Sequence, residues 1–429
     1  MDGSPEVTTN TWILVPDITR KPRSRSLKHA LGEAVSLAKA LPGLNLVGKL
    51  VVGFRAPNPG NFFGKGKISE LNVLFKDFSV ELVLIDGYVS PVQQRNLEKL
   101  WGLKILDRTG LILEIFSDRA RTREGVLQVE MAALSYQKTR LVRAWTHLER
   151  QRGGLGFVGG PGETQIESDR RAIDTQLMRL KRQLGKVVKT RKLHRKARAK
   201  VPYPVVALVG YTNAGKSTLF NCITGAEVFA EDMLFATLDP TMRAVKLESG
   251  MDIILSDTVG FITDLPTELV AAFRATLEEV TAADLVIHVR DISHFDSAAQ
   301  AKDVELILDT LGLDPSVPRM EIWNKTDILD LESLNRLNNS SERLDRVYMT
   351  SAVNGEGVQE LLEGLSLVLS LDKVSDELAL NFSEGKKRAW LFNQKVVRNE
   401  CQTETGFIIQ VDWTGRQKKN LLNYRFLSG

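Results

Sequence analysis

The stretch Gly210-Tyr-Thr-Asn-Ala-Gly-Lys-Ser217 decides the fold of this chain. It follows an apolar run and precedes a segment with helical periodicity, so it fits the pattern GxxxxGK[ST] in the context that this motif requires. Backbone N–H groups of such a loop can close around phosphate oxygens at the start of a helix. The alternative is an ordinary glycine-rich turn, against which the partner motifs below argue. The residues predicted to bind nucleotide here are Gly210, Tyr211, Thr212, Asn213, Ala214, Gly215, Lys216, Ser217 and Thr218.

Three short segments supply the groups that are expected to act on the phosphates. Lys216 is expected to contact the β- and γ-phosphates, and Ser217 is expected to bind magnesium. Asp257 opens the segment Asp257-Thr-Val-Gly260 after an apolar run, where it can hold the same ion, usually through a water. The N–H of Gly260 can sense the γ-phosphate, and Thr237 is assigned as a second magnesium-binding hydroxyl. We assign catalysis to Lys216, Asp257, Gly260 and Thr237, although an aspartate after a strand is by itself more often a turn residue.

A further motif, Asn324-Lys-Thr-Asp327, predicts recognition of guanine. Asp327 can accept hydrogen bonds from N1–H and the 2-amino group of guanine, whereas adenine would leave this carboxylate unpaired. Asn324 and the stem of Lys325 are expected to line the base. Ser351 and Ala352 follow another expected strand and would offer a backbone N–H to guanine O6. Because the motifs occur in order, the sequence predicts GTP and GDP rather than ATP as ligands.

The remaining pattern predicts an α/β protein with several domains. Expected strands alternate with helical segments across residues 201–372, which is typical of a mostly parallel sheet with helices on both faces. Residues 1–120 alternate similarly and predict a small N-terminal α/β domain, while residues 373–429 predict a small α+β domain. The strands expected in the central domain are 205–209, 243–247, 252–255, 284–289, 319–323 and 347–350.

Residues 121–200 predict a helical hairpin, the arm of the molecule. Apolar residues recur at alternating steps of three and four across 127–148 and again across 173–187, which is typical of helices packed lengthwise. Six of the ten residues 153–162 are glycine, so a flexible loop is expected at the tip. The pattern Thr164–Glu167 has capping-box spacing and is expected to start the second helix.

The charge of the chain is concentrated in this hairpin. The net charge is +4, yet residues 179–200 hold eleven of the 57 lysines and arginines and no acid, so removing them leaves 46 basic against 53 acidic residues, or −7. This distribution favours one localised contact with a polyanion. The alternative is a solvated helix face beside a linker. The residues expected to contact RNA are Gly153, Gly154, Gly156, Gly159, Gly160, Gly162, Arg191, Lys192, Arg195, Lys196 and Arg198.

Composition excludes several other classes of protein. Hydrophobic residues make up 43% and charged residues 26%, as in globular proteins, and no apolar run approaches the ~20 residues of a membrane span. Residues 1–12 lack the basic-then-apolar layout of a signal peptide. Cys222 and Cys401 are too few for a disulfide framework or a zinc cluster. We therefore expect a cytoplasmic protein.

Three stretches resemble the HflX family of ribosome-associated GTPases, which are related to translation factors. They are GGLGFVGGPGETQIESDRR at Gly153–Arg171, Phe63-Gly-Lys-Gly-Lys67, and Asp107-Arg-Thr-Gly110 with the following residues 115–128. The resemblance covers about residues 10 to 370 and implies binding to the large ribosomal subunit near its peptidyl-transferase region. It further implies that the arm enters the ribosome in the GTP state, that stalled ribosomes are split or rescued, and that ribosomes stimulate hydrolysis.

Two residues bear on the rate of hydrolysis. Phe261 stands where many GTPases have a glutamine that orients the attacking water, so intrinsic hydrolysis is expected to be slow. Asn213 resembles an asparagine that accompanies potassium in similar phosphate loops, which makes K⁺ a hypothetical second cation beside Mg²⁺. Elsewhere, Gly64–Lys67 is expected to form a turn, and His288 is expected to be a packed imidazole rather than a metal ligand.

Two other functions fit parts of the pattern. A GTP-dependent regulator of a protein or membrane partner would use the hairpin as an oligomerisation device, although Lys138 interrupts the apolar seam. A tRNA-modification GTPase, which Asn213 also suggests, would be expected to carry an added cofactor-binding or methyl-transfer domain, and none is evident. An arm that enters a ribosomal cavity favours a monomer.

Overall fold

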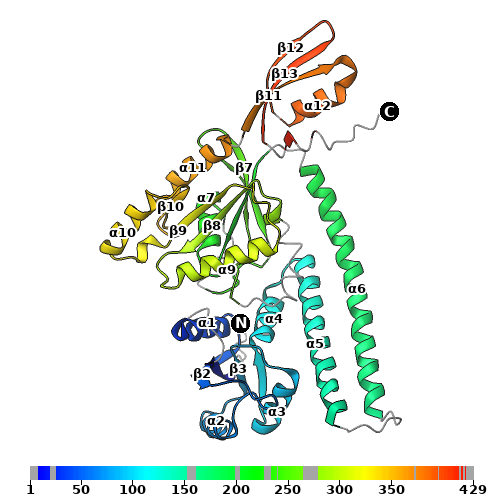
Figure 1. Cartoon of the computed structure of the whole chain (residues 1–429), viewed down its shortest axis with the longest axis vertical. Helices are drawn as coiled ribbons and strands as arrows, with labels where there is room; N and C mark the ends of the chain where they lie inside the picture. The colour runs from blue at the N-terminus through cyan, green and yellow to red at the C-terminus, as the bar shows by residue number, and fades with distance from the viewer. Residues whose placement is uncertain are drawn as a thin grey trace, which may run out of the picture.

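The structure, a computed structural model, describes residues 8–19, 26–151, 161–198, 203–226, 233–238, 240–263, 279–371, 373–394, 396–414, 417–418 and 421. Figure 1 shows one sheet at the bottom, a larger sheet in the middle and a small sheet at the top, with two long helices along one side. No helix in the described part of the chain is long and apolar enough to cross a membrane.

The N-terminal sheet is parallel, with the strand order β2-β1-β3-β4. Helices cover both of its faces, so Ile13 and Leu14, which are neighbours in β1 and point to opposite sides, are both buried. The elements are β1 (Thr9–Ile18), α1 (Leu27–Lys39), β2 (Leu44–Phe54), α2 (Lys65–Asp77), β3 (Leu82–Ile85), α3 (Pro91–Trp101), β4 (Lys104–Asp107) and α4 (Arg108–Arg119).

The segment Gly64–Lys67, which the sequence predicts to be a turn, is instead the beginning of α2. Gly64 is the N-cap of this helix, and Lys65 is its first residue. The reason lies further along the chain, because Ile68, Leu71 and Phe75 recur at helical spacing and are all buried against the sheet.

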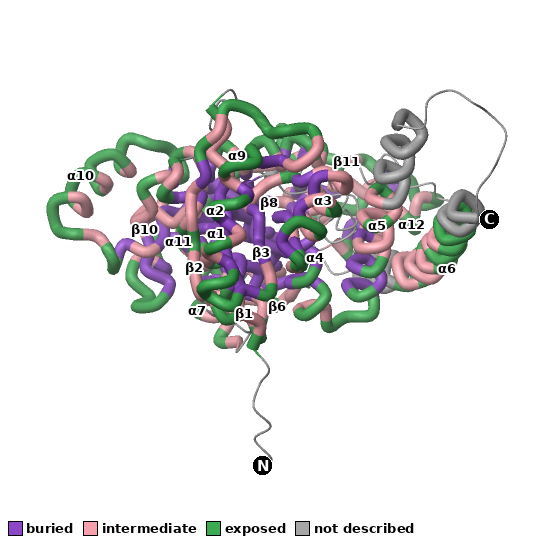
Figure 2. Tube along the Cα trace, turned by 90° about the horizontal axis from the view of Figure 1, so that it is seen from below, coloured by how far each residue is buried: buried purple, intermediate pink, exposed green. Residues whose placement is uncertain are grey.

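The arm consists of two antiparallel helices, α5 (Arg123–Gln151) and α6 (Pro161–Arg198). With 29 and 38 residues they are about 43 and 57 Å long. The helices contact each other along the arm, where Lys138 pairs with Asp174. Figure 2 shows that α6 is exposed or half-buried where its side chains are described, at residues 167–190, whereas α5 has buried residues near its start, within 124–132.

The second helix of the arm begins at Pro161, three residues before the predicted capping residue Thr164. Proline favours the first turn of a helix, because its φ is already helical and it lacks an N–H. The tip glycines predicted to contact RNA, Gly153 to Gly160, lie outside the described residues, as do the side chains of 161–166 and 191–198. The helix ends seven residues before the first strand of the central domain.

The central sheet has six strands in the order β10-β9-β8-β5-β7-β6, all parallel except β6. Ala207 and Val209 of β5 pack on the α9 side, while Val206 and Leu208 pack on the side of α7 and α11. The predicted parallel sheet with helices on both faces is confirmed. The elements are β5 (Val205–Gly210), α7 (Lys216–Thr224), β6 (Thr241–Lys246), β7 (Asp252–Asp257), β8 (Leu285–Asp291), α9 (Ser297–Thr310), β9 (Arg319–Asn324), η1 (Thr326–Ile328), α10 (Leu331–Ser341), β10 (Val347–Met349) and α11 (Val358–Leu371).

The C-terminal elements form an antiparallel sheet in the order β11-β13-β12, covered by one helix. Leu391 of this helix packs against Ile409, Val411 and Trp413, which are all buried. The elements are β11 (Lys373–Asn381), η2 (Phe382–Glu384), α12 (Gly385–Asn393), β12 (Val397–Gln402) and β13 (Gly406–Thr414).

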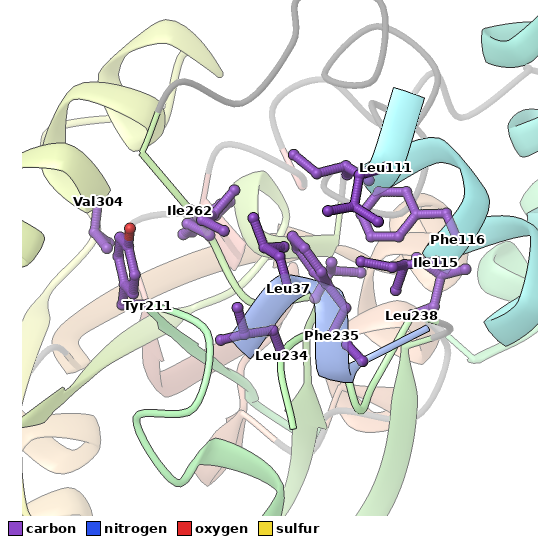
Figure 3. Close-up of a cluster of buried hydrophobic side chains, with 14 of the residues drawn as sticks. Leu37, Leu111, Ile115, Phe116, Tyr211, Leu234, Phe235, Leu238, Ile262 and Val304 are labelled. Carbon is purple, nitrogen blue, oxygen red and sulfur yellow. The ribbon is translucent and has the colours of Figure 1, made fainter. Parts of the chain in front are cut away.

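An apolar cluster continues from the N-terminal domain into the central domain (Figure 3). Its centre is an edge-to-face contact between Phe116 of α4 and Phe235, with ring centroids 4.6 Å apart. The helices α1 and α4 therefore dock directly onto loops of the central domain. The labelled members of the cluster are Leu37, Leu111, Ile115, Phe116, Tyr211, Leu234, Phe235, Leu238, Ile262 and Val304.

Candidate functional site

The phosphate loop joins β5 to α7 and requires a left-handed backbone at two positions. Gly215 has φ +90° at the N-cap of α7, and Asn213 has φ +61°. Glycine and asparagine adopt this region most readily. The loop, the first switch segment (residues 233–238) and Gly260 surround a small cavity of about 40 Å³. The cavity lies at the N-terminus of α7, where backbone N–H groups favour an anion.

Ser217, Thr237 and Asp257, which the sequence assigns to magnesium, meet at this cavity. Ser217 Oγ lies 2.6 Å from Thr237 Oγ1 and 2.7 Å from Asp257 Oδ2, and Thr237 Oγ1 lies 3.0 Å from the same carboxylate oxygen. Burial raises the pKa of Asp257, and its Oδ1 is buried without a hydrogen-bond partner. Hydroxyl and carboxylate oxygens are the ligands that magnesium prefers, so these residues fit such an ion.

Lys216 and Gly260 face each other across the phosphate loop. The Lys216 Nζ donates to the carbonyl oxygen of Tyr211 at 2.8 Å. Burial lowers the pKa of Lys216 to about 8, although the Asp257 carboxylate acts in the opposite direction. A phosphate in the cavity would restore the charged form. A Cβ at Gly260 would lie 2.8 Å from Thr212 Cα and 2.9 Å from Lys216 Nζ, so this approach needs glycine.

Asn324, which the sequence predicts to line the base, is bonded to two loops of the site. It is buried, and its Nδ2 donates to the carbonyl oxygen of Ala214 at 2.9 Å. Its Oδ1 accepts from the N–H of Ala352 at 3.0 Å. Asn324 therefore joins the phosphate loop to the 351–352 loop, and its place beside the base stays a prediction. A spacing motif shows that an amide is needed here but does not show which groups it binds.

The other residues predicted to recognise guanine lie close together. The Asp327 carboxylate is exposed, and it accepts from the Ser351 hydroxyl at 2.7 Å, which orients it. Lys325 has φ +65°, and its ammonium pairs with Asp291 at 2.8 Å. This pair fixes the ammonium end of Lys325, and the stem of the lysine can then pack against a base.

Phe261 and His288 both belong to the apolar interior. Phe261 is 1% exposed, and its backbone bonds to the phosphate loop, with the Thr212 N–H donating to Phe261 O at 2.7 Å. The side chain packs in the cluster between the domains and does not act on a water at the phosphates. Burial lowers the pKa of His288 to about 4, as a packed imidazole requires.

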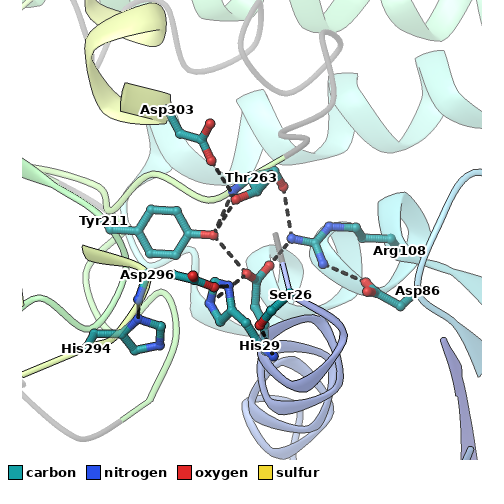
Figure 4. A network of polar contacts seen from close by, with 10 residues as sticks. Ser26, His29, Asp86, Arg108, Tyr211, Thr263, His294, Asp296 and Asp303 are labelled. Atoms are coloured by element: carbon teal, nitrogen blue, oxygen red, sulfur yellow. Dashed lines mark hydrogen bonds and ion pairs between the residues drawn. The ribbon is translucent and has the colours of Figure 1, made fainter. Parts of the chain in front are cut away.

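Two residues of the site escaped the sequence prediction, namely Glu33 and Arg108 of the N-terminal domain. Arg108 donates to the carbonyl oxygen of Thr263 at 2.9 Å, and Glu33 accepts from the Tyr211 hydroxyl at 2.8 Å (Figure 4). The stretch Asp107-Arg-Thr-Gly110 contributes to the resemblance, yet it gives no sign of a partner 155 residues away.

Comparison with known proteins agrees with this geometry. Three family descriptions match successive parts of the chain: GTP-binding GTPase N-terminal at residues 28–117, GTP-binding GTPase Middle Region at 119–198 and 50S ribosome-binding GTPase at 205–325. The GTPase HflX of Magnetococcus marinus is 47% identical over 378 residues, which are 88% of this chain and 85% of that protein. This chain belongs to the HflX family of GTPases.

Other relatives of this HflX chain extend the comparison. The GTPase HflX of Escherichia coli is 42% identical over 386 residues, which are 88% of this chain and 90% of that protein. A crystal structure of a GTP-binding protein from Sulfolobus solfataricus in complex with GDP covers 85% of this chain and 99% of its own, at 22% identity and a TM-score of 0.44. Family membership and the phosphate loop confirm that this HflX chain binds guanine nucleotides and hydrolyses GTP.

Proposed function

We propose that this HflX chain is a GTP-controlled factor that binds the large ribosomal subunit and splits or rescues stalled ribosomes. The exposed basic helix α6 supports this most directly, because it accompanies a domain that matches the 50S ribosome-binding GTPase family. Lysine and arginine bind mainly RNA phosphates, which gives affinity with little sequence readout. In the GTP state the arm would enter the ribosome toward its catalytic centre, and hydrolysis would release it. Such a factor would work in the cytoplasm.

We assign the phosphate chemistry to five residues. Magnesium, when bound, would offset the charge of the β- and γ-phosphates. Ser217, Thr237 and Asp257 would hold the ion, which their convergence on one side of the cavity supports. Lys216 would bind the β- and γ-oxygens, and the N–H of Gly260 would contact the γ-phosphate. Loss of this phosphate would free Thr237 and Gly260 and so change both switch segments.

We propose that intrinsic hydrolysis is slow and that ribosomes accelerate it. The packed side chain of Phe261 leaves the usual water-orienting position without a polar group.

Potassium bound near Asn213 is a second part of the proposal. Turnover would then be faster in potassium than in sodium buffer at equal ionic strength, and equal rates would remove this ion from the proposal.

Sucrose-gradient sedimentation with a non-hydrolysable GTP analogue tests ribosome binding. The full chain should travel with the large subunit in the presence of the analogue but not with GDP. A variant with glutamine at the five basic positions of the α6 end should bind on the order of 100-fold more weakly at physiological salt, because phosphate contacts are lost. These positions are Arg191, Lys192, Arg195, Lys196 and Arg198.

A matched variant controls for the change in net charge. It carries glutamine at five exposed basic positions elsewhere and should bind ribosomes as the wild type does. Equal weakening of both variants, or absence of the wild type from ribosomal fractions, would contradict the proposal. The control positions are Lys76, Lys99, Lys302, Arg336 and Arg343.

Light scattering on the free chain should give a monomer, and a dimer that needs α6 would favour the oligomerisation reading.

A further inference from the structure

A buried ionic cluster joins the N-terminal domain to the second switch segment (residues 260–263), as Figure 4 shows. Its centre is Arg108, the first residue of α4, which is 4% exposed. Its Nη1 pairs with Asp86 Oδ1 at 2.6 Å, while its Nη2 pairs with Glu33 and donates to Thr263 O at 2.9 Å. The planar fork of arginine makes several such contacts possible at once. One side chain therefore holds two carboxylates and the backbone of the switch segment.

Glu33 extends this cluster into the phosphate loop. Its Oε2 accepts from the Tyr211 hydroxyl at 2.8 Å, and the Tyr211 oxygen accepts from the Thr263 N–H at 2.9 Å. Burial and the Glu33 charge raise the pKa of Tyr211, so the phenol keeps its proton. Thr263 Oγ1 donates to Asp303 of α9 at 2.7 Å. Tyr211 and Thr263 are thus fixed to each other and to the N-terminal domain.

The same helix, α4, also holds the first switch segment. Phe235 has φ +58°, a conformation that is rare outside glycine, and its ring packs on Phe116. Arg119 Nη2 lies 3.8 Å from Met233 Sδ. Thr237 is two residues beyond Phe235, so the position of α4 bears on both segments that contact the γ-phosphate end of the site.

Asp107, the residue before Arg108, faces the arm instead. It is 1% exposed and caps α4, with the Gly110 N–H donating to its Oδ1 at 2.9 Å. Its Oδ2 accepts from Arg140 Nη2 of α5 at 2.6 Å, and its Oδ1 accepts from the Tyr136 hydroxyl. The guanidinium of Arg140 lies over the Tyr136 ring, with 4.3 Å between Cζ and the ring centroid. The middle of α5 is therefore fixed to the start of α4.

We propose that Asp107 and Arg108 couple the middle of α5 to the nucleotide site, with Arg108 and Glu33 as positioning residues for Tyr211 and Thr263. Neighbouring residues at the start of one packed helix cannot move independently, so displacement of α5 is passed to the switch segment. The contact with α5 and the nucleotide site then both act on the start of α4, and such a shared element is the physical requirement for coupling. The role of the arm as the ribosome-contacting part rests on the proposed function.

Dissociation of a fluorescent GDP from the full chain, measured by stopped flow without ribosomes, tests the coupling. Arg108→Lys keeps the charge but loses the fork, so Tyr211 and Thr263 lose their fixed position and release should be about tenfold faster. Arg140→Lys in the middle of α5 should accelerate release about threefold, although this residue is remote from the nucleotide. Arg388→Lys, which alters a similar two-pronged pair with Glu400 in the C-terminal domain, should leave the rate unchanged.

Two double variants separate positioning from a merely structural role. Arg108→Lys with Arg140→Lys should release GDP no faster than Arg108→Lys alone, because both act through one path. Glu33→Gln should accelerate release in the wild type, and its effect should be smaller when Tyr211→Phe has removed the phenol, because only the contact of Glu33 with Arg108 is then left to be weakened. Thermal unfolding followed by circular dichroism shows which variants remain folded, and Arg140→Lys and Glu33→Gln keep the test open if Arg108→Lys does not fold.

The coupling would be overturned if the effects of the single substitutions on the rate of GDP release multiplied in both double variants. It would also be overturned if a folded Arg108→Lys chain released GDP at an unchanged rate. The readout is independent of ribosomes. Coupling in a chain that fails to sediment with ribosomes would support the positioning roles and overturn the proposed function alone. Ribosome binding by a chain without coupling would support the proposed function and overturn the positioning roles.

Discussion

The two ends of the nucleotide site are held by different parts of the molecule. At the base end, Asn324, Asp327 and Ser351 are bonded to one another or to neighbouring loops of the central domain. At the phosphate end, Tyr211 and Thr263 are bonded to side chains of the N-terminal domain. The base end is therefore complete within one domain, whereas the phosphate end is shared between two.

This difference separates recognition from control. A base pocket built within one domain can select guanine in any state of the protein. A phosphate end that depends on a second domain can respond to what that domain and the arm contact. The following predictions test whether the two ends are as independent as their contacts indicate.

The largest effect is expected for Asp327→Asn at the base end. An amide would present a donor to the N1–H and 2-amino groups of guanine, so GTP affinity should fall on the order of 10³-fold. Xanthosine triphosphate, which has an oxygen at C2, should bind better than GTP and be hydrolysed at a rate near that of the wild type with GTP. Nucleotide titration and steady-state kinetics measure both, with the exposed Asp345→Asn as control. A fall of kcat as large as the loss of affinity would show that the ends are not independent.

A smaller effect is expected for Asn324→Ala, which removes the amide between the two ends. It leaves the Ala214 carbonyl and the Ala352 N–H buried without this partner, at a cost of about 3 kcal/mol in the free energy of unfolding. Urea unfolding of the nucleotide-free chain measures the loss. A change within experimental error would mean that other groups bridge the two loops.

The phosphate end should give the nucleotide-free chain a dependence on pH. Burial lowers the pKa of Lys216 to about 8 from 10.5, so between these values the unfolded chain binds more protons than the folded chain. The free energy of unfolding should therefore rise with pH across this window, and the gain is lost as pH falls through 8. The gain should be on the order of 2 kcal/mol by about pH 10. Urea unfolding of the wild type and of Lys216→Met isolates it, and parallel pH profiles would contradict the assignment.

The smallest effect is expected for Thr350→Val. The Thr350 hydroxyl donates to Asn324 Oδ1 at 3.3 Å, a long bond inside the core. Its loss should reduce the free energy of unfolding by about 0.5–1 kcal/mol. The same change in the Asn324→Ala background should reduce the free energy of unfolding by less. An equal loss in both backgrounds would show that the bond between Thr350 and Asn324 does not cause the loss.

The sequence predicts the elements of the site better than their contacts. Spacing alone places Ser217, Thr237 and Asp257 in one cluster, because each follows a recognisable strand or loop motif. It does not show that Asn324 joins two other loops, which supply its hydrogen-bond partners. It gives no hint of Arg108, because pairing between residues far apart in the chain leaves no local pattern. The start of α2 is missed because two glycines and two lysines read locally as a turn, although the apolar residues beyond them require a helix.

The length of α6 sets how far a small motion at its base would carry. At about 57 Å, this straight rod would act as a lever, and a tilt of about 5° at one end would sweep the other through about 5 Å. That sweep exceeds the reach of any single hydrogen bond. One rotation can therefore produce a sub-ångström shift beside the phosphates and a much larger displacement at the far end of the helix.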